Sequence, residues 1–320
     1  MFDPRSPYHR RRWHYDSDQP LSVAQLIAAG SLDAPTAALL WICAQRHRSL
    51  IVSGPTDPTP GVGKTTTLNA LLEFLPAGTT LVYTMGMYED FDFVTETEAA
   101  STCVLANEVS DHLPIYMWGR VARKLLRLPA DGFAIATSCH ADTIDDVLAM
   151  LQRDLRLDRA EVGQLGVVVN IGLVGRIWPP RRRFLTVNYL REPAVSAENA
   201  SAPPSAAAAP SAATSPRGGA RTPVDPRPAD VLPLCAWDAT SDTLTPPTTE
   251  ALAALAECLG MTAPALNAAL ARRTTVLEQL ATGQGSGIQA TRRAIEELMR
   301  DETAALAADP GSAPPPPDAE

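Results

Sequence analysis

Residues 61 to 65 read Gly-Val-Gly-Lys-Thr, a set of residue types that can hold phosphate groups. The two glycines let backbone N–H groups approach an anion closely. The ammonium of Lys64 can reach the β- and γ-phosphates of a nucleotide, and the hydroxyl of Thr65 can bind Mg²⁺. The segment therefore predicts a site for ATP with Mg²⁺, in which Thr65 binds the metal. The residues predicted to bind the nucleotide are Gly54, Gly61, Val62, Gly63, Lys64, Thr65 and Thr66.

The loop before Lys64 is longer than the usual G-x-x-x-x-G-K-[ST] spacing. Position 58 is a proline, and Gly54 lies four residues earlier than that spacing requires. We interpret residues 57–60 as a short insertion in the loop. A β-rich run at 49–53 precedes the loop and a helical pattern at 64–75 follows it, as a phosphate loop requires.

Two further polar positions follow apolar runs typical of strands. Glu108 comes shortly after the run 102–106, where a carboxylate could activate the attacking water. His140 comes after the run 133–137, and residues at the carboxyl ends of central strands face the ligand crevice of an open α/β sheet. We expect Glu108 to be the hydrolytic carboxylate, and His140 to have a functional rather than a structural role.

The apolar pattern alternates between short β-rich runs and helical segments. Helical spacing occurs at 21–29 and 34–45, and further strand-like runs occur at 80–84, 134–137 and 167–171. Strands that alternate with helices favour a mostly parallel sheet covered on both faces. The predicted fold class is α/β.

Composition divides the chain further. Residues 193–230 are dominated by Ala, Pro and Ser and predict a disordered linker between a core at 21–192 and a small helical domain at 231–305. The prediction of a helical domain is based on apolar residues at helical spacing within 250–259, 263–280 and 289–299. Residues 1–20 predict a flexible arm, and residues 306–320, with four consecutive prolines, a disordered tail.

The formal net charge of −9 argues against a protein that coats nucleic acid. Clusters of arginine at 10–12, 120–127 and 181–183 are interpreted as solvated surface. The five cysteines show no metal-binding or disulfide spacing, which favours a reducing compartment. No stretch approaches the length of a membrane span, and no apolar leader segment is evident. We therefore expect a cytoplasmic protein.

The order of these motifs resembles that of the secretion/pilus ATPase superfamily, the motors of type II and type IV secretion, type IV pili and the archaellum. Three segments carry the resemblance: the T-T-T-L-N-A-L run within 64–72, an Asn-Glu-Val-Ser-Asp segment at 107–111 that is similar to the Walker B motif, and Ala-Thr-Ser-Cys-His-Ala-Asp-Thr at 136–143, which is similar to the histidine box. Residues 237–299 resemble the carboxyl-terminal module of archaeal-type members.

This resemblance implies a RecA-like P-loop core, ATP with Mg²⁺, and a homohexameric ring. It also implies a membrane platform protein as partner and a location at the inner face of the membrane.

The chain departs from the family at several positions. Gly86 and Met87 stand where the family has the first two acids of its Asp box, which leaves Glu89 as the next catalytic candidate, with Asp90 beside it. Ser110 replaces the arginine of the Walker B segment. The region 92–101 is shortened and loses arginines expected there, and about twenty residues precede the core where the family has an N-terminal domain.

Two functions follow from these features. One is a motor-type ATPase subunit of a secretion or pilus-like system, which the intact Lys64, Thr65 and Glu108 favour. The other is a nucleotide-dependent regulatory protein or switch with weak or no hydrolysis, which Gly86 and Met87 favour. Both predict clear ATP binding, and the missing acids and arginines predict slow turnover.

Overall fold

A computed structural model describes residues 20–55, 61–113, 116–175, 179–191, 230–283 and 286–308. Nearly all of the predicted arm, nearly all of the predicted linker and most of the predicted tail lie outside these residues. Those three predictions, and the interpretation of residues 57–60 as an insertion, are therefore unchanged by the structure.

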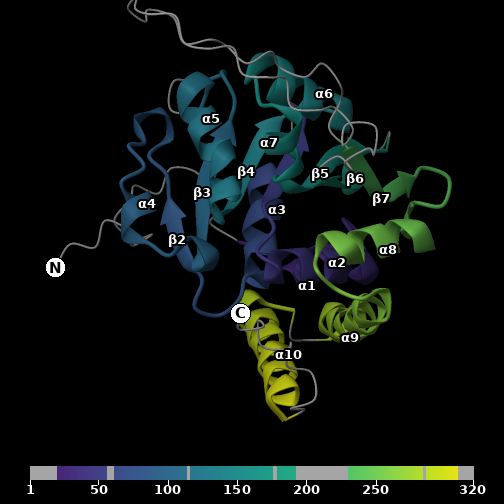
Figure 1. The fold of residues 1–320 in the computed structure, drawn as a ribbon. Coiled ribbons are helices and arrows are strands. Elements are labelled where there is room, and N and C mark those ends of the chain that lie inside the picture. Colours follow the sequence, from purple (N-terminus) through teal and green to yellow (C-terminus); the bar gives the residue numbers. More distant parts are fainter. Residues whose placement is uncertain are drawn as a thin grey trace, which may run out of the picture.

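One mixed sheet of eight strands runs through the described part of the chain (Figure 1), in the order β2-β3-β4-β1-β5-β6-β7-β8. The pairings from β2 to β5 are parallel, and those from β5 to β8 are antiparallel. The strands are β1 (Leu50–Gly54), β2 (Thr80–Tyr83), β3 (Thr102–Val109), β4 (Ala134–His140), β5 (Gly166–Val174), β6 (Arg181–Arg191), β7 (Asp230–Asp238) and β8 (Thr243–Thr245). The α/β class with a mostly parallel sheet is confirmed.

Alternate residues of the central strands face two separate apolar cores. In β1, Leu50 and Val52 belong to one core, whereas Ile51 belongs to the other. This alternation follows from the two-residue period of a strand. Both faces of the sheet are therefore covered, which is why the parallel strands are nearly continuous apolar runs.

Helices cover both faces of the sheet. One core contains residues of α1, α2, α3, α8, α9 and α10, and the other contains residues of α5, α6 and α7. The helices are α1 (Val23–Ala28), α2 (Ala34–Gln45), α3 (Lys64–Leu71), α4 (Phe93–Glu96), α5 (Gly119–Arg127), α6 (Ile144–Ala149), α7 (Arg159–Gly163), α8 (Thr249–Cys258), α9 (Ala263–Thr282) and α10 (Ile288–Ala308). Short helical turns include η1 (Leu72–Phe74) and η2 (Gly86–Tyr88).

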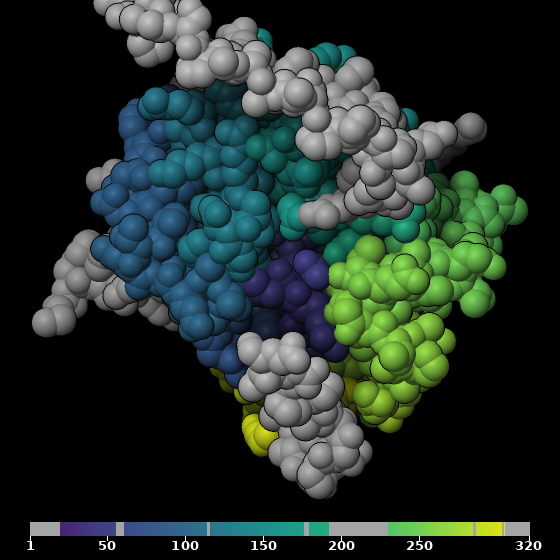
Figure 2. Space-filling model, viewed as in Figure 1, coloured from purple at the N-terminus to yellow at the C-terminus, as the bar shows by residue number. Residues whose placement is uncertain are grey.

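The carboxyl-terminal segment shares its core with the first two helices. Leu255, Leu266 and Leu277 are buried in the same cluster as Trp41 of α2, and Figure 2 shows this green segment directly beside the purple amino-terminal helices. The buried Arg273 lies over the Trp41 ring at 5.1 Å. The helices α8, α9 and α10 overlap the predicted helical spans, and α10 continues to Ala308, well beyond the predicted end at residue 299.

Two strands that the sequence analysis did not predict, β7 and β8, also belong to the carboxyl-terminal segment. Both extend the common sheet, so the segment is not purely helical. Its independence as a domain stays a prediction.

No single helix in the described ranges is long and apolar enough to cross a membrane. The pair α8 and α9 would meet the length and composition together, with a bend of 101° between them.

Candidate nucleotide site

The phosphate loop leaves the end of β1 and returns to the fold at the start of α3. Gly63 is the N-cap of α3, with φ 93° and ψ 29°. This left-handed conformation is accessible to glycine at little cost and is unfavourable for residues with a Cβ. No side chain caps the helix, so the first-turn N–H groups can bind an anion.

Register places His140 beside the start of this loop. Gly54 and His140 are partners in the β1–β4 pairing, so the last residue of β4 lies next to the last residue of β1. A Cβ on Gly54 would lie 2.8 Å from the carbonyl oxygen of Ile171 on the other side. Only glycine fits between the two neighbouring strands at this point.

A β-bulge sets the direction of Glu108. The β3–β4 register shifts between Ala106 and Val109, and such irregularities re-aim side chains. The hydroxyl of Ser138 donates to the carbonyl of Asn107 within the shift, at 2.8 Å. The N–H of Met117 donates to the carbonyl of Glu108 at 3.0 Å, which fixes the backbone at this position. Glu108 therefore lies inside β3, two residues beyond the predicted end of that strand.

Lys64, His140 and Glu108 form one continuous row. The Nζ of Lys64 lies 3.0 Å from Nδ1 of His140 and donates to the carbonyl of Pro55 at 3.2 Å. The Nε2 of His140 lies 2.6 Å from Oε1 of Glu108. Because an ammonium can only donate, Nδ1 accepts and the imidazole proton is on Nε2, where it donates to the carboxylate. The row fixes both the tautomer and the orientation of His140.

The row also keeps Glu108 ionised. Burial raises the pKa of this carboxyl, but the hydrogen bond from His140 lowers it, as do Ser110 and Lys64. The pKa of Glu108 is therefore below its ordinary value. The hydroxyl of Ser110 donates to Oε1 at 2.9 Å. Cys139 is next to the row, and burial raises the pKa of its thiol to about 12, so it is not a thiolate nucleophile at neutral pH.

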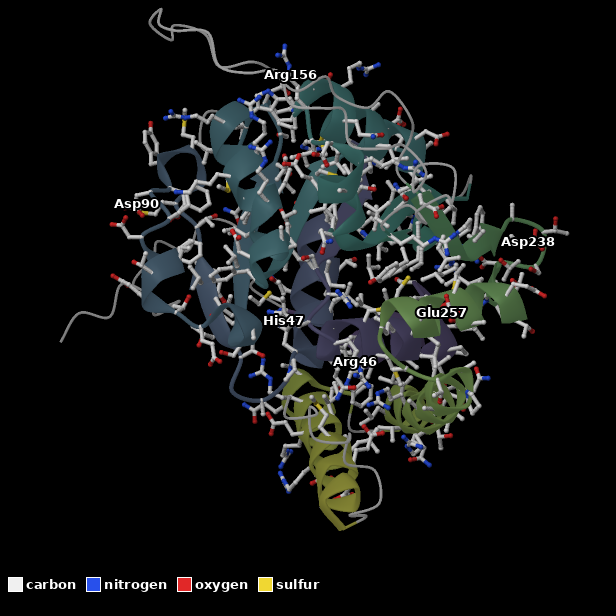
Figure 3. The ribbon with its side chains drawn as sticks, viewed as in Figure 1. Arg46, His47, Asp90, Arg156, Asp238 and Glu257 are labelled. Atoms are coloured by element: carbon white, nitrogen blue, oxygen red, sulfur yellow. The ribbon has the colours of Figure 1, made fainter. Side chains whose placement is uncertain are left out.

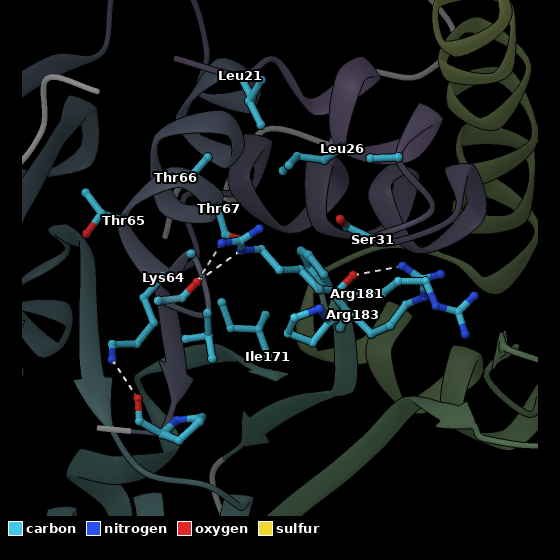
Figure 4. Close-up of a pocket in the computed structure, with 18 of the residues that line it drawn as sticks. Leu21, Leu26, Ser31, Lys64, Thr65, Thr66, Thr67, Ile171, Arg181 and Arg183 are labelled. Carbon is cyan, nitrogen blue, oxygen red and sulfur yellow. Dashed lines mark hydrogen bonds between the residues drawn. The ribbon is translucent and has the colours of Figure 1, made fainter. Parts of the chain in front are cut away.

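Lys64, His140 and Glu108 line one cavity of about 770 Å³, a size typical of ligand pockets. Figure 4 shows this cavity with Lys64 labelled. Most of the remaining lining comes from α1 and the residues beside it, from β5 and from the start of β6, and it combines apolar side chains with Arg181, Arg182 and Arg183. Of the predicted site residues, the cavity is lined by Gly61, Val62, Gly63, Lys64, Thr65, Thr66, Glu108 and His140.

Gly54 and Glu89 do not belong to this lining. Gly54 instead lets two strands approach, as described above. The carboxylate of Glu89 accepts from the N–H groups of Met85, at 2.7 Å, and Phe91, at 3.1 Å. It thereby stabilises its own loop after β2. Asp90 lies at the outer edge of the molecule in Figure 3. The catalytic role of Glu89 stays a prediction without support from this arrangement.

Arg182 also lines the cavity and is not among the predicted site residues. Arg182 donates from Nε and Nη2 to the carbonyl of Gly61, at 3.0 and 2.9 Å. The sequence interpretation of the cluster 181–183 as solvated surface rests on the usual behaviour of charged runs. Strand β6 brings all three arginines to the cavity, and no local signal distinguishes Arg182 from its two neighbours.

Comparison with known proteins gives little further information. No family model matches the chain. A stretch of 59 residues, 18% of the chain, is 44% identical to an uncharacterized protein of Methanocaldococcus jannaschii and covers 10% of that protein. The ATPase DotB of Yersinia pseudotuberculosis has a TM-score of 0.28 and 14% identity, over 55% of this chain and 49% of DotB. The chain thus spans about a tenth of the first protein and about half of the second.

Proposed function

We propose that this chain binds ATP with Mg²⁺ in the cavity above α3 and hydrolyses it. The observation that carries the proposal is the row from Lys64 through His140 to Glu108, which joins a phosphate-loop lysine to a buried, ionised carboxylate. A cation for the phosphates and a base for water thus meet in one cavity.

The residues present fit a magnesium nucleotide. The cavity combines the uncapped amino terminus of α3, the ammonium of Lys64 and an apolar wall. Thr65 lies in the first turn of α3 and also lines the cavity. Mg²⁺ is typically held by one or two protein oxygens together with phosphate oxygens, so the Thr65 hydroxyl would hold the ion. The metal would neutralise charge on the phosphates.

Each side chain of the row has a distinct role in hydrolysis. Glu108 is ionised and can accept a proton from water that attacks the terminal phosphate. His140 donates to Glu108 and holds the carboxylate in one orientation. Lys64 binds the phosphates electrostatically, since phosphoryl transfer depends mainly on positioning and charge stabilisation.

The biological role that we propose is that of a motor-type subunit of a type II/IV secretion or type IV pilus-like system. The order of the motifs within 64–143 supports this role, as does the strand order β5-β1-β4-β3-β2, which fits a RecA-like core. Such a subunit would act as a hexamer in the cytoplasm, beside a membrane platform protein.

A nucleotide-dependent switch with weak hydrolysis is the second candidate. It is favoured by the loop after β2, where Gly86 and Met87 replace acids and Glu89 is engaged by backbone N–H groups. Met85, Met87 and Tyr88 are exposed there. An apolar loop in this place suits contact with another protein better than catalysis.

The proposal is tested with Lys64→Ala, and the control is Lys124→Ala, which alters the only other lysine of the chain. Titration with a fluorescent ATP analogue should show binding by the wild type and by the control. We expect Lys64→Ala to lose at least about a hundredfold in affinity, because it removes a charge-assisted contact to phosphate. Equal affinity in all three proteins would overturn the proposal.

A phosphate-release assay and a mass measurement with and without ATP separate the two candidates. Turnover with ATP-dependent assembly supports the motor. Tight binding without turnover supports the switch.

A further inference from the structure

The side chain of Arg182 lies across the phosphate loop. Its guanidinium binds the Gly61 carbonyl through two N–H groups. A Cβ on Gly63 would lie 3.4 Å from Cδ and 3.6 Å from Nε of the same arginine. Arg182 therefore contacts the loop at both of its described glycines, immediately before Lys64.

The two neighbouring arginines are held by one carboxylate, that of Asp242. Arg181 donates to Asp242 at 2.6 Å, and Arg183 binds both oxygens of Asp242 at 2.9 Å. Trp237 donates to the same carboxylate at 3.0 Å. All three arginines line the cavity, but Asp242 holds Arg181 and Arg183. Of the three, Arg182 is the one that contacts the phosphate loop.

The guanidinium is only partly used by Gly61. Arginine has five N–H donors, and two of those of Arg182 bind the carbonyl. Within the described ranges the others have no protein partner, and the side chain is exposed at the cavity. The planar fork of arginine suits bidentate binding of phosphate oxygens.

We propose that Arg182 is a second cation of the nucleotide site, supplied by the same chain, which donates to a phosphate of the bound nucleotide while it remains on Gly61. The inference rests on the proposed function. It gives the site a second cation beside Lys64. The ligand class is a nucleoside di- or triphosphate, since the arginine lies against the phosphate loop.

Three variants separate a phosphate-binding cation from a residue that only fastens the loop. Arg182→Gln can still donate to Gly61 but carries no charge. Arg182→Lys keeps the charge but cannot form the two-pronged contact with Gly61. Arg153→Gln changes an exposed arginine outside the cavity and serves as the control. The readouts are the Kd for a fluorescent ATP analogue at several salt concentrations, and thermal unfolding without nucleotide.

We expect Arg182→Gln to weaken binding about tenfold or more and to flatten the dependence of log Kd on log salt, because one charge contact to phosphate is lost. Arg182→Lys should keep most of the affinity and the steeper salt dependence. All three variants should unfold at the wild-type temperature. Wild-type binding and salt dependence in Arg182→Gln would overturn the inference, as would equal loss in Arg182→Lys and Arg182→Gln. A wild-type protein that does not bind ATP would overturn the proposed function and this inference together.

Discussion

The Nε2 of His140 lies 2.6 Å from Oε1 of Glu108, and the two side chains are 14% and 10% exposed. The two residues come from neighbouring parallel strands and meet because β3 has a bulge at Glu108. A short hydrogen bond that is largely shielded from water is electrostatically stronger than the same bond in water. The protonation state of Glu108 therefore depends on His140.

Glu108→Gln should bind ATP but hydrolyse it much more slowly. The amide keeps the size and can still accept from His140 and Ser110, yet it cannot accept a proton from water. General-base catalysis typically contributes about 10²- to 10⁴-fold, so a loss of that size is expected. Phosphate release measured beside nucleotide affinity checks the prediction. Wild-type turnover in this variant would mean that another carboxylate is the base, with Glu89 the next to replace.

His140→Ala should move the acidic limb of the kcat/KM profile to higher pH. The variant keeps the burial that raises the pKa of Glu108 but loses the hydrogen bond that lowers it. The lowered pKa of Glu108 stabilises the folded state at pH values above the pKa of this carboxyl in the unfolded chain. This contribution is lost as the pH falls through the pKa in the folded state. That contribution should shrink in the variant.

The pH profile of His112→Ala provides the comparison for His140→Ala. In the wild type, the ring of His112 lies 4.6 Å from that of His140 and makes no contact with Glu108. The acidic limb should therefore stay in place in this variant. An unmoved limb in His140→Ala would contradict the coupling.

Glu73→Gln should stabilise the protein above pH 7. Glu73 is buried between α1 and α10, accepts from the Val23 N–H at 3.2 Å, and has its pKa raised to about 7 by burial. Between the pKa of this carboxyl in the unfolded chain and pH 7, the folded state therefore holds a proton that the unfolded state has lost. The free energy of unfolding of the wild type falls as the pH rises through that interval. The difference at pH 8 should be on the order of 2 to 3 kcal/mol.

Denaturant unfolding at pH 5 and pH 8 measures this effect. The exposed Glu297→Gln on α10 should follow the wild type at both values. Parallel pH curves for Glu73→Gln and the wild type would show that the pKa of Glu73 is not raised.

Limited proteolysis should cleave the chain within 193–228, which is predicted to be a linker because its composition offers few apolar side chains to bury. The two fragments should stay together in gel filtration. Arg191 and Asp230 are partners in the β6–β7 pairing, and α9 packs on α2 in the same core. Separation of the fragments without denaturant would show that the carboxyl-terminal segment folds as an independent domain, and resistance to cleavage would contradict the linker.

Much of the fold can be read from the sequence because its signals are local. The apolar runs at 49–53, 80–84, 102–106, 134–137 and 167–171 correspond to β1 to β5, and Lys64 begins a helix as its glycine-rich loop predicts. Polar residues that follow such runs are at the carboxyl ends of parallel strands, which share one edge. That rule was sufficient to select Glu108 and His140.

The tertiary structure decided the features that depend on pairing between distant segments. Whether β7 joins the sheet depends on β6 across nearly forty residues of intervening chain, and no local pattern contains that information. The carboxylate of Glu89 turns to the backbone of its own loop, while the bulge in β3 turns Glu108 towards His140. The three consecutive arginines are equivalent in sequence, but the strand that carries them gives two to Asp242 and one to the phosphate loop. A side chain's chemistry is written in its residue type, whereas its partner is set by strand register and alternation, and these exist only once the sheet has formed.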